Sequence, residues 1–160
     1  MTTGVAAAQQ ESLETRLKGN YTGEFRWNGD RIRQVVDMRI VDVNRVSQTR
    51  LEAIGCGRYN ANGVITNIRI KMAVDEPSLD VEIWESSPVG DPKFVTDGSH
   101  KGRLTEFPRR IEATWTTKRT GQQGKLAVSE GGNLGCDAQM RPVSPGGAPG
   151  SRSSQGSMGR

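Results

Sequence analysis

Apolar and polar side chains alternate residue by residue through most of this 160-residue chain, from Gly19 to about Ser129. A period of two places successive side chains on opposite faces of a β-strand, whereas an amphipathic α-helix repeats its apolar residues every three or four positions. The clearest stretch is 64–74, where Ile68, Ile70 and Met72 alternate with polar or basic residues. The pattern therefore predicts an all-β fold.

Eight segments carry this alternation and are separated by residues that favour turns, such as those at 28–30 and 60–63. We expect strands at about 21–27, 31–43, 49–59, 64–74, 79–85, 101–107, 110–117 and 125–129, with an interrupted piece at 94–96 before the sixth. The connections are too short for parallel crossovers, which indicates antiparallel pairing. Because closure removes the two free edges of a sheet, an up-and-down (meander) barrel is favoured over a sandwich.

The two ends of the chain differ in composition from this body, which we place at 19–136. Residues 1–18 form a leader: its small residues at 5–8 resemble the end of a secretory signal peptide, or they form a flexible alanine-rich stretch. A short helical turn is expected within 11–18, with Ser12 as a candidate N-cap. Residues 137–160 are rich in Gly, Pro and Ser, a composition that predicts a disordered tail.

Glycines recur near the predicted strand starts, in Gly19-x-Tyr21-x-Gly23 and, more weakly, at 98–102 and 121–124. These openings resemble those of small barrels of the calycin and avidin class. The resemblance covers about residues 19–130 and concerns architecture only. It implies a barrel whose interior is either packed or holds one small ligand. The chain has neither a biotin-site pattern nor a lipocalin signature, so no ligand residues are carried over.

The charge distribution and the hydropathy argue against two classes of protein, nucleic-acid-binding proteins and proteins with a transmembrane helix. The chain has 22 basic and 18 acidic residues, a formal net charge of +4. Basic and acidic residues are interspersed along the strands, which indicates a mixed solvated surface and no nucleic-acid interface. No run of 18 uncharged apolar residues occurs, so no transmembrane helix is predicted.

The predicted inward faces supply the candidates for a ligand site. Aromatic walls with a few directed polar groups are typical of small-molecule pockets. The candidate ligand-binding residues are Tyr21, Phe25, Trp27, Gln34, Thr66 and Trp115. In the alternative interpretation, the tryptophans fill the barrel while Gln34 and Thr66 lie at its mouth in water.

Outside the predicted barrel interior, three residues stand out. Trp84 falls on an outward face, where it either covers a loop or contacts a protein partner. Cys56 and Cys136 either form one disulfide, as in an oxidising compartment, or remain two unrelated buried thiols. The resemblance of the leader to a signal peptide favours the disulfide and a periplasmic or secreted location over a cytoplasmic one.

No catalytic residues, metal ligands or cofactors are predicted. The single histidine, His100, lies in a predicted glycine-flanked turn, and Glu24, Glu82 and Glu112 point outward by parity. One histidine and two distant cysteines cannot build a zinc site, and no glycine-rich phosphate loop is present.

The sequence therefore predicts a binding protein of the cell envelope or secreted space that holds a small hydrophobic or aromatic molecule in its barrel. A protein-interaction module of the inhibitor, adaptor or effector type is the alternative, using Trp84 and the segment 86–93. A third option is an enzyme that acts mainly by shaping an apolar cavity, because that class needs few ionisable residues.

Overall fold

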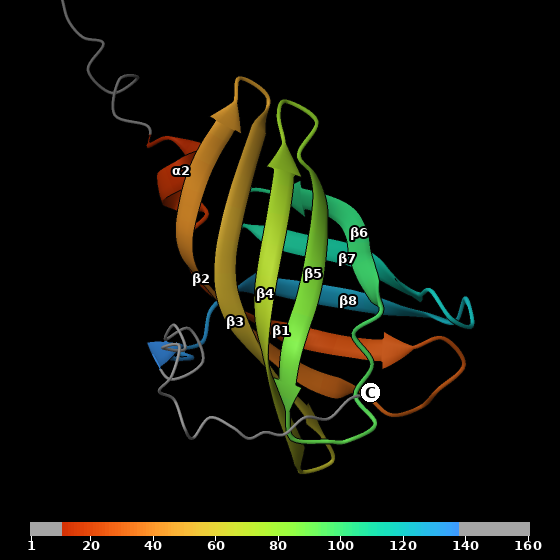
Figure 1. The fold of residues 1–160 in the computed structure, drawn as a ribbon. Coiled ribbons are helices and arrows are strands. Elements are labelled where there is room, and N and C mark those ends of the chain that lie inside the picture. Colours follow the sequence, from red (N-terminus) through yellow and green to blue (C-terminus); the bar gives the residue numbers. More distant parts are fainter. Residues whose placement is uncertain (1–10, 138–160) are drawn as a thin grey trace, which may run out of the picture.

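The predicted strands close into an eight-stranded antiparallel barrel in the computed structural model of the chain, which describes residues 11–137 (Figure 1). Each strand pairs with the next, and β8 pairs with β1. The strands are β1 (Gly19–Trp27), β2 (Gln34–Ser47), β3 (Arg50–Ala61), β4 (Val64–Asp75), β5 (Asp80–Val89), β6 (Gly98–Thr105), β7 (Arg110–Thr117) and β8 (Gln123–Glu130). The predicted all-β meander barrel is confirmed, and its architecture agrees with the calycin-like resemblance.

The long strands β2 to β5 arch over one side of the barrel, and β6, β7, β8 and β1 cross behind them (Figure 1). A register shift between Ile40 and Asp42 marks the point where β2 bends against β3. Gly55 lies opposite this bend, where a Cβ atom would be only 1.8 Å from the backbone oxygen of Arg39. Glycine is required here because the two backbones approach too closely for any side chain.

The barrel interior holds one continuous apolar core made by the inward residue of every second position. The predicted inward faces of the strands are largely confirmed. The fully buried large side chains are Trp115, Tyr21, Phe25, Leu17, Ile40, Leu51, Ile68, Met72, Ile83, Leu104, Ile111 and Leu126.

A short helix, α2 (Leu13–Arg16), closes one end of the barrel, with Ser12 at its N-cap position as expected. Leu13 and Leu17 are buried in the barrel core. The Tyr21 hydroxyl donates a hydrogen bond of 2.7 Å to the backbone oxygen of Leu17. The turn that precedes β1 is therefore packed into this end of the barrel, and we call residues 13–17 the plug.

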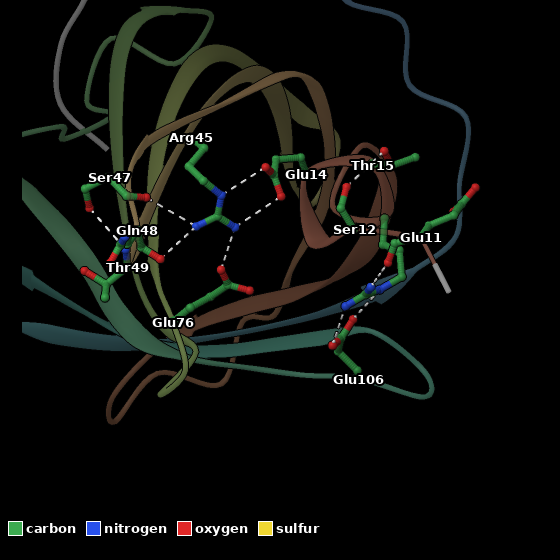
Figure 2. A network of polar contacts seen from close by, with 11 residues as sticks. Glu11, Ser12, Glu14, Thr15, Arg45, Ser47, Gln48, Thr49, Glu76 and Glu106 are labelled. Atoms are coloured by element: carbon green, nitrogen blue, oxygen red, sulfur yellow. Dashed lines mark hydrogen bonds and ion pairs between the residues drawn. The ribbon is translucent and has the colours of Figure 1, made fainter. Parts of the chain in front are cut away.

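Arginine side chains attach this plug to the barrel rim. Figure 2 shows the Arg45 guanidinium between Glu14 of α2 and Glu76 of the β4–β5 connection, at 3.0 and 2.6 Å. Arg45 also donates to the backbone oxygens of Ser47 and Gln48. Such ion pairs at a surface contribute little to stability. Their main effect is to fix where α2 sits on the rim, since the buried leucines supply most of the stabilisation.

The segment after β8 packs on the outside of the barrel. Cys56 points outward from β3 and forms a disulfide with Cys136. Leu134, Cys56 and Cys136 make a small buried cluster separate from the main core. Arg39 donates a hydrogen bond of 3.3 Å to the backbone oxygen of Leu134. This segment thus covers part of the outer face of β2 and β3, and the predicted bridge is present.

Several predicted strand boundaries were wrong, and three of the differences bear on the site or the core. β2 starts at Gln34, so Ile32 lies in the β1–β2 connection and is 44% exposed instead of facing the core. Residues 94–96 belong to no strand. β6 begins at Gly98, which places His100 in a strand and not in a turn. In each case loop packing decided what the local alternation left ambiguous.

Residues 1–10 of the predicted leader (1–18) and residues 138–160 of the predicted tail (137–160) lie outside the described residues. Within 11–137, no helix is long and apolar enough to span a membrane.

Candidate functional site

The end of the barrel opposite α2 contains the most polar part of the interior. We call it the loop end, since the β1–β2, β3–β4, β5–β6 and β7–β8 connections lie there. The β5–β6 connection folds inward and buries Phe94, which is 2% exposed. Thr66 on β4 supports this connection by accepting a hydrogen bond of 3.0 Å from the backbone N–H of Asp91.

Three polar side chains meet inside the barrel near the loop end: Tyr59 of β3, Glu85 of β5 and His100 of β6. Their exposures are 2, 6 and 0%, so all three are removed from solvent. The Tyr59 hydroxyl donates to Glu85 Oε2. His100 Nε2 lies 2.9 Å from the same oxygen and 3.2 Å from the Tyr59 hydroxyl. We refer to these residues as the Tyr–Glu–His cluster.

Aromatic rings enclose the Tyr–Glu–His cluster. The His100 ring lies 4.8 Å from Trp115 and 5.9 Å edge-on to Phe25, and Tyr59 lies 5.0 Å from Phe94. Edge-to-face contacts at these distances are favourable. The Phe25 ring occupies the space that a side chain at position 124 would fill, since a Cβ on Gly124 would lie 2.3 Å from Phe25 Cζ.

A surface cavity of about 240 Å³ opens at the loop end. Its lining comprises Trp27, Val95, Asp97, Thr117, Arg119, Thr120 and Gln122. We call this cavity the vestibule. Gly98 pairs with Thr117 and His100 pairs with Trp115, so the inward layer next to the vestibule lining is the one that holds His100. Trp27 contacts both layers, because it lines the vestibule and its ring lies edge-on to the Phe25 ring at a centroid distance of 5.2 Å.

The buried polar atoms at this end that have no hydrogen-bond partner among residues 11–137 include His100 Nδ1 and Asp97 Oδ1. The other carboxylate oxygen of Asp97 accepts a hydrogen bond of 3.1 Å from the backbone N–H of Arg119. Buried polar atoms are almost always paired with protein or water. These two atoms therefore mark positions where a further molecule would find an unoccupied polar contact.

Five of the six predicted ligand residues lie toward the loop end. Trp27 and Trp115 are both register neighbours of Gly124, which confirms the expected proximity of the two tryptophans. Gln34 pairs with Phe25 across β1 and β2 and is half-buried. Thr66 is buried and holds the β5–β6 connection.

Tyr21 was grouped with these residues because it shares their strand face, but the structure places it at the α2 end. It is four residues from Phe25, which is about 13 Å along a strand. Its hydroxyl bonds Leu17 and accepts a hydrogen bond of 3.2 Å from Arg109 Nε. Tyr21 thus anchors the plug.

Burial raises the pKa of Tyr21 to about 12, and the nearby Arg109 guanidinium opposes this only in part. An unfolded tyrosine ionises near pH 10, so the folded protein holds this proton more tightly. The resulting stabilisation is present below pH 10 and is lost as the pH rises toward 12, by up to about 2–3 kcal/mol. Urea unfolding at pH 9 to 12 should show this loss, and Tyr21→Phe should flatten the dependence. An equal slope in the variant would contradict this origin.

Sequence reasoning missed the Tyr–Glu–His cluster, although one signal was present. Glu85 has the same parity as Val81 and Ile83, which were predicted to be buried, and parity alone places it inside. His100 was assigned to a turn, and Tyr59 was not singled out among the inward residues. Glu24, Glu82 and Glu112 point outward as predicted.

Trp84 lies on the outer face of β5, opposite Lys71 of β4, and is half-buried. Its outward orientation agrees with the prediction. A role in partner binding stays a prediction.

Comparison of the chain with protein-family models, with curated proteins and with solved structures finds no match.

Proposed function

We propose that this barrel binds a ring-sized apolar or aromatic molecule at its loop end. In this proposal the ligand occupies the vestibule against Trp27, and Phe25 and Trp115 form the aromatic layer beneath it. Gln34 and Thr66 support the rim. Tyr21 is not part of the site, because it lies at the α2 end.

The observation that carries the proposal is the Tyr–Glu–His cluster buried in aromatic surroundings below an open cavity. Taking a carboxylate out of water costs several kcal/mol, which its partners repay only in part. A barrel that needed only stability would fill this layer with apolar side chains at lower cost. Buried ionisable groups beside a cavity are typical of functional sites.

The size of the vestibule limits the ligand. Pockets for drug-sized molecules measure roughly 300–1,000 Å³, whereas the vestibule has about 240 Å³. A single aromatic ring with one or two substituents fits this volume. Larger ligands would need Phe94 and its connection to move.

The cysteine pair supports a location outside the cytoplasm. Disulfides form and persist in oxidising compartments and are rare where glutathione keeps thiols reduced. The Cys56–Cys136 bridge therefore supports a periplasmic or secreted protein. Ligands reaching such a protein would come from the extracellular or periplasmic space.

Tryptophan fluorescence tests the binding proposal, because the chain has three tryptophans in distinct places. Titration with phenol, fluorobenzene and toluene, excited at the red edge of the indole band, should change the emission of the wild type. Trp27→Phe should remove most of this change, since Trp27 lines the vestibule.

Trp84→Phe is the matched control, as it removes a tryptophan from the outer face of the barrel. This variant should keep the full ligand response. Loss of the response in both variants, or no response of the wild type to any of the three molecules, would argue against a site at the loop end.

A further inference from the structure

We infer that the ligand carries a hydrogen-bond donor, such as a phenolic hydroxyl or a ring N–H, which His100 Nδ1 accepts. The inference rests on the proposed binding function and names the chemical class of the ligand. It is carried by the buried Nδ1 atom near the loop end, which has no hydrogen-bond partner within residues 11–137.

The hydrogen bonds of the Tyr–Glu–His cluster determine which nitrogen of His100 accepts. Tyr59 has one hydroxyl proton and donates it to Glu85 Oε2. An ionised carboxylate only accepts, so the contact of 2.9 Å between His100 Nε2 and this oxygen places the imidazole proton on Nε2. The neutral ring then carries its lone pair on Nδ1.

The surroundings of His100 leave one ring nitrogen for a further contact. The ring is 0% exposed and lies against Trp115 and Phe25. Within residues 11–137, Nδ1 has no hydrogen-bond partner. Nδ1 is thus the acceptor that we assign to the ligand, with Glu85 and Tyr59 as positioning residues.

Asp97 presents a second acceptor at the vestibule. It lines the cavity, and its backbone oxygen and Oδ2 accept hydrogen bonds from Lys118 and Arg119. These contacts fix the carboxylate, whereas Oδ1 stays buried without a described partner. Asp97 directly precedes β6 and His100 lies within it, so a ligand with a second donor would have a further acceptor at the vestibule.

The donor requirement is tested with phenol and fluorobenzene, which have nearly the same size but differ in the presence of an O–H. A hydrogen bond to an otherwise unpaired buried acceptor strengthens binding by about tenfold. We therefore expect the wild type to bind phenol about tenfold more tightly than fluorobenzene in a calorimetric or NMR titration.

His100 is the single histidine of the chain, so its imidazole nitrogens can be observed without ambiguity after ¹⁵N-histidine labelling. The free protein should show one protonated and one unprotonated nitrogen. Phenol should shift the unprotonated resonance in the direction of hydrogen bonding, and fluorobenzene should not.

His100→Phe provides the decisive variant, because it removes the acceptor Nδ1 and keeps an aromatic ring in this layer. The tenfold preference for phenol should disappear, whereas binding of fluorobenzene should persist. Glu82→Gln, on the outer side of β5, is the matched control and should keep the preference for phenol.

The outcomes separate the two proposals. If phenol and fluorobenzene bind the wild type equally well, the donor requirement is wrong while ring binding at the loop end stands. If neither binds, the proposed function fails and this inference with it. A protonated Nδ1 in the free wild type would overturn the assigned role of His100 directly.

Discussion

Glu85→Ala is expected to lower the free energy of unfolding by about 3–5 kcal/mol, because it removes one partner of a buried polar cluster. The Tyr59 hydroxyl and His100 Nε2 would lose their shared acceptor inside the barrel. A cavity would also form where the side chain is 6% exposed. Urea denaturation at pH 7 measures the loss.

Glu82→Ala is the comparison for this measurement, since Glu82 lies on the same strand but faces outward. We expect its effect to stay within about 1 kcal/mol, as for most surface substitutions. Similar losses for the two variants would mean that the buried cluster contributes nothing specific to stability.

A triple apolar variant separates stability from function at the same site. With Tyr59→Phe, Glu85→Leu and His100→Phe together, no member of the cluster is left unpaired. Well-packed apolar replacements of buried ionic groups are often neutral or stabilising by about 1–4 kcal/mol. The triple variant should therefore be far more stable than Glu85→Ala, yet it should have lost the preference for phenol. A triple variant as unstable as Glu85→Ala would mean that the cluster is structural.

The second large effect is expected at the disulfide. Replacing Cys56 and Cys136 by serine should cost about 2–4 kcal/mol, since the bridge closes a long loop in the unfolded chain. The two cysteines are separated by 80 positions. The same change should release Leu134, which is 5% exposed in its cluster with the two cysteines.

Thermal unfolding with and without a reducing agent measures this contribution. Reduction should lower the wild-type melting temperature to that of the serine variant, whereas the serine variant should not respond. Because the bridge lies on the outer face of β3, phenol affinity at the loop end should change little at temperatures where both proteins are folded. A wild type that is insensitive to reduction would contradict a stabilising role of the bridge.

The fold could be predicted from sequence because its rules are local. Alternation identified which side chains face inward, and the short turns identified which strands pair. Trp27 and Trp115 illustrate how far such reasoning reaches, since a closed meander makes β1 and β8 neighbours and thereby brings both residues beside Gly124. Boundaries were less certain, as Ile32 and the start of β6 show, because connections fold back onto the barrel.

The residues of the proposed site could be predicted only in part. The sequence singled out Phe25, Trp27 and Trp115 because bulky aromatic residues on an inward face are conspicuous. Tyr21 satisfied the same criterion and lies at the opposite end, since parity specifies the face of a strand but not the level along the barrel axis. Glu85 and His100 were missed because Glu85 was not considered among the inward residues of its strand and His100 was assigned to a turn.

The sequence by itself determined the class of fold, the pairing order of the strands and the face on which each side chain lies, since these follow from a period of two and from short connections. Only the tertiary structure decided that Tyr59, Glu85 and His100, which are separated by 26 and 15 positions along the chain, meet in one buried layer. Their contact depends on the register of every strand pair, including the shift in β2. In a closed barrel the staggers between neighbouring strands add up around the barrel and set the level of each residue along its axis. Local sequence patterns do not specify the combined register of all strand pairs. For that reason only the closed barrel shows that these three polar side chains share one layer.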